Sequence, residues 1–273
     1  MTESVLLKAK KPDQDTPDFV TPPTQDQLLY DDGIPMETYR HKLQMDLLVY
    51  PLEAWLSDRD AFVSGNMFVY FSPHQLKNHD FRGPDMFAVL DVPKGERKCW
   101  VVWEEGKGPD VVVELLSQST ASLDKTQKKE IYQKRLRVPE YFWFDPFNPR
   151  DFAGFTISDL EYQPIIPDPQ GRLISKQLGL ALVLWSGQYK EANTTWIRWA
   201  TPDGVLLPTA EEFAQQAQQQ AEQAQQQAEQ AQQQAEQAQQ RVEQVESQLQ
   251  QERQRTEALL AKLKAYGIDP DAV

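Results

Sequence analysis

A single glutamate interrupts an otherwise apolar stretch, VVVELLS, which runs from Val111 to Ser117. Three valines before Glu114 and two leucines after it predict a β-strand that is covered on both faces. A lone carboxylate in such a strand costs several kcal/mol unless something compensates its charge. The sequence therefore requires a compensating positive charge close to Glu114.

A second acid, Asp85, follows Pro84 directly before the apolar stretch MFAVLDV. A proline before the acid and an apolar strand after it place this carboxylate at a strand end. If the two strands are neighbours, Asp85 and Glu114 converge and can share one cation. Asp110 lies on the same strand face as Glu114, but at roughly 3.3 Å per residue it is about 13 Å away, too far to share a metal ion.

A helix is predicted from about Leu123 to Leu136, and one of its lysines can supply the positive charge. At about 100° per residue, Ile131 and Tyr132 share one side of this helix with Lys128. Lys129 lies about 100° away and is expected to point to solvent. Lys128 is therefore predicted to face the sheet.

Two carboxylates and a lysine on neighbouring elements have two physical interpretations. In the first, Glu114 and Lys128 form a buried ion pair without chemistry, an arrangement that stabilises little for its desolvation cost. In the second, the carboxylates hold Mg²⁺, which prefers oxygen ligands. Such an ion acidifies a water molecule and polarises a phosphate, while the lysine stabilises the charge that develops in the transition state. The second interpretation predicts hydrolysis of a phosphodiester.

The order of these residues resembles the PD-(D/E)XK nuclease superfamily, with PD at Pro84 and Asp85, ELL at Glu114, and a lysine on the following helix. A longer composite is similar to the Uma-type restriction endonuclease family. It consists of PDVVVELLSQST, then Asp124, Lys128 and Tyr132, then VPEYFWFDP.

This resemblance covers roughly residues 31 to 205 and implies an α/β fold, with a restriction-endonuclease-like mixed central sheet flanked by helices. It implies dependence on Mg²⁺, with Mn²⁺ as a substitute, and DNA as the substrate. It also implies that Asp85 and Glu114 are metal ligands and that the Leu115 carbonyl is a third. Lys128 is then the catalytic lysine.

The chain departs from the superfamily pattern at two positions. The lysine expected two residues after the glutamate is replaced by Leu116, and in the Uma type it is displaced to the following helix, where Lys128 stands. Gln118 replaces a proline that often follows the Leu-Ser pair. Neither change removes a ligand, so the expected function is a Mg²⁺-dependent endonuclease. The alternative is a catalytically inactive nuclease-fold module that acts as a binding or assembly protein.

Three basic side chains on the predicted helix are candidate DNA contacts: Lys125, Lys129 and Arg135. A solvated helix face explains them equally well. His41, on an earlier predicted helix, either lines the site or lies on the helix surface, and we expect it on the surface.

The chain is predicted to begin with a flexible arm over residues 1–30, which are rich in Pro, Asp and Gln. Residues 31–208 form the predicted nuclease-like domain, which starts with a helix from Met36 to about Ser57 that Pro51 can kink. Strands are predicted at MFVYF, MFAVLDV, CWVVW, DVVVELL, YFWFD, FAGFTI, LEYQPII, LALVLW and WIRWA. This order of elements indicates an α/β domain.

The last part of the chain repeats AEQAQQQ units every seven residues. Alanines recur from Ala214 to Ala238 in alternating steps of three and four, and Val242, Val245 and Leu249 continue them. This heptad seam predicts a coiled coil over residues 209–266, and hence a homodimer or higher oligomer. A single solvated helix is the alternative, because alanine buries little area. Residues 267–273 are predicted to form a short tail.

The net charge of −13 argues against tight, non-specific binding of nucleic acid over the whole surface, although basic residues cluster locally in DKTQKKEIYQKRLR. Cys99 is the sole cysteine, which excludes an intrachain disulfide and favours a reducing compartment. The longest apolar stretch, LGLALVLW, is too short to span a bilayer, and the N-terminus has no signal-peptide core. We therefore expect a cytoplasmic protein without a membrane partner.

Overall fold

The structure, a computed structural model of the whole chain, describes residues 22–30, 38–73 and 81–265. The chain divides into two compact units, with the boundary between Thr209 and Ala210. Three parts of the sequence predictions lie outside the described residues: residues 1–21 of the arm, Met36 at the start of the first helix, and residues 266–273 at the C-terminus.

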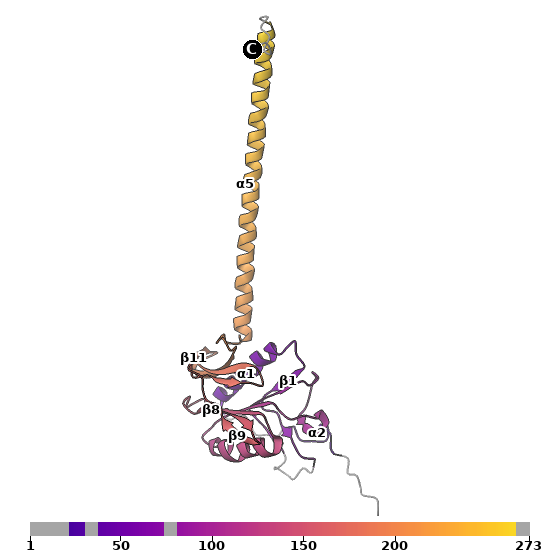
Figure 1. Cartoon of the computed structure of the whole chain (residues 1–273), viewed down its shortest axis with the longest axis vertical. Coiled ribbons are helices and arrows are strands. Elements are labelled where there is room, and N and C mark those ends of the chain that lie inside the picture. The colour runs from indigo at the N-terminus through magenta and orange to yellow at the C-terminus, as the bar shows by residue number, and fades with distance from the viewer. Residues whose placement is uncertain (1–21, 31–37, 74–80, 266–273) are drawn as a thin grey trace, which may run out of the picture. The chain divides into compact units, whose positions relative to one another are not determined.

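A six-stranded mixed sheet forms the centre of the first unit, in the order β1-β4-β6-β7-β8-β9 (Figure 1). Its strands are β1 (Ala61–Ser64), β4 (Met86–Leu90), β6 (Val111–Leu115), β7 (Glu140–Phe144), β8 (Phe152–Ser158) and β9 (Glu161–Pro164). Strands β6 and β7 run parallel, and the other neighbouring pairs run antiparallel. The predicted α/β class with a mixed central sheet is confirmed.

Two three-stranded sheets accompany the central one. The first contains β10 (Leu173–Ser175), β11 (Leu180–Tyr189) and β12 (Ala192–Ala200), and the second contains β3 (Phe81–Arg82), β2 (Val69–Tyr70) and β5 (Trp100–Val101). The predicted strand CWVVW is shorter than expected, because a turn of helix, α2 (Val102–Glu105), begins directly after β5.

Helix α1 (Tyr39–Trp55) packs against β1, β4, β6 and β12. Its N-cap is Thr38, whose hydroxyl accepts a hydrogen bond from the backbone N–H of His41. Pro51 lies inside the helix, which continues to Trp55. Leu48 and Leu52 are fully buried in the core that α1 shares with the central sheet.

A second helical segment packs on the opposite face of the central sheet. It consists of α3 (Ala121–Leu123), the π-helix η1 (Asp124–Lys128), α4 (Lys129–Ile131) and the π-helix η2 (Tyr132–Leu136). Val111, Val113 and Leu115 of β6 face the α1 core, whereas Val112 belongs to the core that contains Tyr132. Because side chains alternate along a strand, Glu114 points to the same face as Val112, towards this helical segment.

Residues 22–30 pack against the later residues of the first unit, although they were predicted to belong to the flexible arm. Leu28 is buried, and the Trp103 indole donates a hydrogen bond to the Pro23 carbonyl at 2.9 Å. The Tyr70 hydroxyl donates to the Leu29 carbonyl at 2.8 Å. These contacts extend the folded part of the chain upstream of residue 31.

The second unit contains helix α5 (Ala210–Ala265), whose 56 residues form one continuous helix (Figure 1). At 1.5 Å per residue it is about 84 Å long. None of its described residues is buried. The long C-terminal helix is thus confirmed, while its assembly into a coiled coil stays a prediction. Among the described residues, no helix combines the length and apolar character needed to cross a bilayer.

Candidate active site

Asp85 lies directly before β4, at the point where this strand meets β6. The antiparallel pairing sets Met86 opposite Val113, which brings Asp85 beside Glu114. The Leu115 N–H donates a hydrogen bond to Asp85 Oδ2 at 2.7 Å and so fixes the carboxylate. Gly65 permits the close approach of β1 here, because a Cβ at this position would lie 2.6 Å from the Asp85 carbonyl oxygen.

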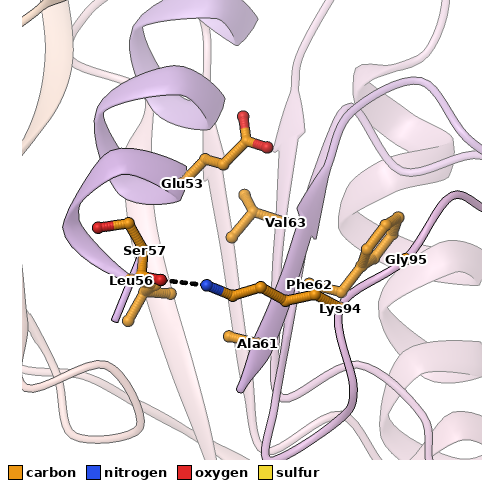
Figure 2. A pocket seen from close by; sticks show the side chains of 8 residues that line it. All are labelled: Glu53, Leu56, Ser57, Ala61, Phe62, Val63, Lys94 and Gly95. Atoms are coloured by element: carbon orange, nitrogen blue, oxygen red, sulfur yellow. Dashed lines mark hydrogen bonds between the residues drawn. The ribbon is translucent and has the colours of Figure 1, made fainter. Parts of the chain in front are cut away.

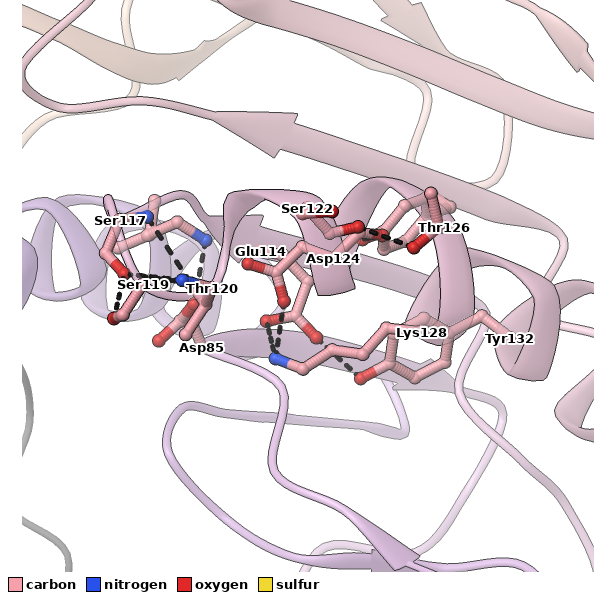
Figure 3. Close-up of polar contacts among 12 residues, drawn as sticks. Asp85, Glu114, Ser117, Ser119, Thr120, Ser122, Asp124, Thr126, Lys128 and Tyr132 are labelled. Atoms are coloured by element: carbon pink, nitrogen blue, oxygen red, sulfur yellow. Dashed lines mark hydrogen bonds and ion pairs between the residues drawn. The ribbon is translucent and has the colours of Figure 1, made fainter.

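Glu114 is fully buried, and its two oxygens have different partners (Figure 3). Lys128 Nζ lies 3.1 Å from Oε2, and the Tyr132 hydroxyl donates a hydrogen bond to Oε1 at 2.7 Å. The predicted meeting of Glu114 with Lys128 is therefore present in the structure. A second buried glutamate, Glu140, accepts a hydrogen bond from the Ser175 hydroxyl and one from the Lys176 N–H, so it needs no cation.

A third acid, Asp124, joins this cluster from the helical segment. Its side chain is 1% exposed, and Oδ1 lies 2.7 Å from Lys128 Nζ (Figure 3). Apart from this ion pair, neither oxygen of Asp124 has a hydrogen-bond partner within the described residues. In the sequence, Asp124 stood out only as part of the family resemblance. Its spacing of four residues from Lys128 is the signal that predicts an ion pair on a helix.

The pKa values in the cluster reflect burial and mutual charge. Burial raises the pKa of Glu114 to about 8; the Lys128 charge opposes this rise, and the charges of Asp85 and Asp124 add to it. Burial also raises the pKa of Asp85 to about 6, although the residue as a whole is only half-buried. Burial alone would lower the pKa of Lys128, but Glu114 and Asp124 outweigh it and raise the pKa above its ordinary value.

The cluster fits a divalent cation, because Lys128 forms ion pairs with two acids and a third, Asp85, lies beside Glu114. A buried oxygen of Asp124, Oδ2, also lacks a hydrogen-bond partner among the described residues. Within the part of the chain that the structure describes, no three His, Cys, Asp or Glu side chains are spaced to enclose a metal ion. Mg²⁺ does not need such a cage, since it keeps several waters and is held by one or two carboxylates. Asp85 and Glu114 are two carboxylates that lie side by side here. The Leu115 carbonyl, predicted as a further ligand, belongs to the residue whose N–H holds Asp85, and its role stays a prediction.

The three basic side chains that were candidates for binding DNA interact with other side chains of the protein. Lys125 forms an ion pair with Asp151, and the Arg135 guanidinium lies 4.7 Å from the ring centroid of Phe71. Lys129 Nζ lies 3.3 Å from the ring centroid of Phe155. The prediction that Lys129 points to solvent is wrong, because the π-helical turns on either side of α4 widen the helix and change the angle per residue.

His41 is buried at 2% exposure, so the expectation of a surface histidine is wrong. Its Nε2 lies 3.1 Å from the Leu116 carbonyl oxygen, and its Nδ1 lies 2.8 Å from the Thr38 hydroxyl. A carbonyl can only accept, so Nε2 carries the proton and the Thr38 hydroxyl donates to Nδ1. His41 thereby ties the start of α1 to the chain directly after β6.

A small cavity lies between the C-terminal part of α1 and β1 (Figure 2). Its volume is about 270 Å³, and its walls include Leu56, Ala61 and Val63. Lys94, which lines it, donates a hydrogen bond to the Ser57 carbonyl. None of the described lining residues belongs to the carboxylate cluster, and we assign this cavity no part in the site.

Residues 22–187 match the model of a family described as "Uma2: Putative restriction endonuclease". No curated protein matches the chain. Among solved structures, it is similar to the "crystal structure of a putative nuclease belonging to DUF820" from Anabaena variabilis, with 16% identity and a TM-score of 0.41, over 57% of this chain and 91% of that one. The TM-score and the identity to this structure are low, so no conclusion is drawn from it. The family match covers more than half of the chain.

Proposed function

Because the chain belongs to the Uma2 family of restriction endonuclease-like proteins, we propose that it is a Mg²⁺-dependent endonuclease that hydrolyses phosphodiester bonds of DNA. The observation that supports this proposal best is the meeting of Asp85, Glu114 and Lys128 at the end of β6. A carboxylate pair beside a lysine supplies both a place for a metal ion and a fixed positive charge.

The residues divide the work between them. Asp85 and Glu114 would hold the Mg²⁺, which when bound would lower the pKa of a water molecule and polarise the phosphate; Mn²⁺ is the second candidate ion. The Leu115 N–H and the Tyr132 hydroxyl fix the orientations of the two carboxylates. Lys128 brings a charged ammonium group that stabilises negative charge on the phosphate oxygens in the transition state.

The direct test incubates the full-length protein with supercoiled plasmid. We expect nicked and linear DNA with Mg²⁺ or Mn²⁺ and intact plasmid with EDTA. A thermal shift by Mg²⁺, without DNA, tests the metal site separately, because a ligand that binds only the folded state raises the melting temperature. Plasmid that stays intact with either metal ion would reject the proposal that the protein is an endonuclease.

A second candidate function is a catalytically inactive nuclease-fold module that binds or assembles through α5. The net charge of −13 favours it, and so does the engagement of Lys125, Lys129 and Arg135 by other side chains. A Mg²⁺-induced thermal shift together with intact plasmid is the result expected for this candidate.

We also propose that α5 pairs with α5 of a second copy, because its alanine and valine seam stays exposed in a single helix. Val242 and Val245 are 56% and 61% exposed. In a parallel pair in register, Arg241 lies at a g position and faces Glu246 at the e position of the partner helix, a contact of opposite charges on both sides of the seam. The Gln–Glu hydrogen bonds, such as Gln218 to Glu222, involve positions outside the seam.

Light scattering should therefore report a dimer or larger oligomer for the full chain and a monomer after truncation at Pro208. Val245→Asp places a charge in the seam and should lower the measured mass. Ser247→Asp, two residues away on the outer side of the helix, is the matched control and should leave the oligomer intact. A monomeric full-length protein at tens of micromolar would exclude the pairing.

A further inference from the structure

A cavity of about 710 Å³ opens at the carboxyl ends of the parallel strands β6 and β7. Its wall combines Thr38 and His41 at the start of α1, Ser117 and Ser119 after β6, and Asp145 and Phe147 after β7. The volume falls within the range of about 300–1,000 Å³ found for ligand sites. In open parallel α/β sheets ligands bind at this end of the strands, and β6 and β7 are the parallel pair of this mixed sheet.

This cavity lies beside the carboxylate cluster. The chain passes from Glu114 and Leu115, through Leu116, directly to Ser117 in the cavity wall. His41, which lines the cavity, lies 3.1 Å from the Leu116 carbonyl oxygen. Three extended residues span about 10 Å, so a group bound here would lie within that reach of a phosphate held at Asp85 and Glu114.

The cavity presents an aromatic ring that is both fixed and accessible. Phe147 is 57% exposed, and the Arg40 guanidinium lies 4.4 Å from its ring centroid. The same Arg40 donates a hydrogen bond to the Pro146 carbonyl at 3.4 Å, which ties it to the same turn. The His41 ring lies 5.8 Å away at a tilt of 43°. The Phe147 ring is therefore fixed in position and exposed enough for a planar group to stack on it.

The lining of the cavity does not favour a phosphate inside it. None of the described lining residues is a lysine or an arginine, and Asp145 contributes an acid. The nearby Arg40 guanidinium lies over the Phe147 ring and donates to the Pro146 carbonyl. The remaining polar groups of the lining are the hydroxyls of Thr38, Ser117 and Ser119, the amide of Gln118 and the imidazole of His41. A flat, uncharged group with hydrogen-bonding edges suits these walls, and in DNA that group is a nucleobase.

We propose that this cavity receives an unpaired nucleobase of the DNA substrate, stacked on Phe147, next to the phosphate to be cut. The inference rests on the proposed nuclease function and adds a substrate class to it. A base within a duplex must be taken out of the stack to enter such a pocket, at a cost that is lowest when the base is already unpaired. The protein should therefore prefer single-stranded or gapped DNA over a fully paired duplex.

The test measures the affinity of the full-length protein for a labelled oligonucleotide by fluorescence anisotropy. The oligonucleotide is either single-stranded or annealed into a duplex, and the buffer contains Ca²⁺ and no Mg²⁺. Phe147→Ala should weaken binding of the single strand by about 5- to 150-fold, the effect of losing one stacked base, and should change duplex binding less than twofold. Phe147→Trp should retain tight binding of the single strand.

Tyr50→Ala is the matched control, since Tyr50 is an aromatic residue of similar exposure, 59%, and does not line this cavity. It should bind both DNAs like the wild type. If the wild type cuts plasmid but Phe147→Ala and Tyr50→Ala bind the single strand with equal affinity, the cavity does not bind a nucleobase. The proposed nuclease function would be unaffected by that result. Equal losses for single strand and duplex would also overturn the proposed binding of a nucleobase. Absence of both DNA binding and cleavage in the wild type would instead reject the nuclease function.

Discussion

Replacement of Lys128 by alanine is expected to slow DNA cleavage by about 10²–10³-fold, the loss typical of removing one preorganised electrostatic donor. Lys128 Nζ lies between Glu114 Oε2 at 3.1 Å and Asp124 Oδ1 at 2.7 Å, so its charge is fixed before substrate arrives. Its side chain is 16% exposed, which leaves it a path to a bound phosphate. Single-turnover cleavage of a labelled oligonucleotide measures the chemical step.

The matched control is Lys134→Ala. Lys134 lies on the same helical segment, is 60% exposed and forms a surface ion pair with Glu130 at 2.7 Å. Its loss should act mainly through salt-sensitive binding and should leave the chemical step nearly unchanged. Because Lys128→Ala leaves two buried acids without their cation, thermal melts must first establish that the variant is folded at the assay temperature. Equal rate losses for the two variants, or an active Lys128→Ala protein, would exclude the catalytic role.

The contacts around Glu114 show which parts of the site can be read from the sequence. Strand alternation places Glu114 on one face, and an apolar run on both sides of it requires burial, so a positive partner follows from physical chemistry alone. The helix after the strand carries one lysine on its apolar side. These arguments are local, and the structure brings Glu114 and Lys128 together as they predict.

The features that were not predicted correctly depend on three-dimensional geometry that a local sequence pattern does not determine. The two π-helical stretches shift side-chain directions from those of an α-helical wheel, which explains the error for Lys129. His41 is buried because the loop after β6, 75 residues along the chain, supplies the Leu116 carbonyl. Such long-range partners cannot be found by periodicity. The short strands β1, β3 and β10 were missed for a similar reason, because their pairing comes from neighbouring strands.

Glu114→Gln is expected to abolish the binding of Mg²⁺, because a carboxylate ligand is replaced by a neutral amide. In the wild type, burial raises the pKa of Glu114 to about 8, so the carboxyl holds its proton at pH 6 and must release it when the metal binds. The affinity for Mg²⁺ should therefore rise about tenfold per pH unit between pH 6 and 8 and level off above pH 8. Calorimetry at pH 6, 7 and 8 measures both effects.

Without metal, the same pKa shift predicts the opposite trend in stability. A carboxyl whose pKa rises on folding binds its proton more tightly in the folded state. The stability that it contributes is complete below the unfolded pKa of 4.5 and is lost as the pH rises to about 8. Glu114→Gln cannot ionise, so its melting temperature in EDTA should fall less between pH 5 and 8 than that of the wild type.

Glu140→Gln is the matched control for this prediction, since Glu140 is also buried, on the neighbouring strand β7, but is satisfied by Ser175 and the Lys176 N–H. It should retain Mg²⁺ binding with the pH dependence of the wild type, whatever its effect on the melting temperature. Wild-type Mg²⁺ affinity that does not change between pH 6 and 8 would contradict the raised pKa. Undiminished Mg²⁺ binding by Glu114→Gln would remove Glu114 from the metal site, and the buried ion pair without chemistry would then be the better description of the cluster.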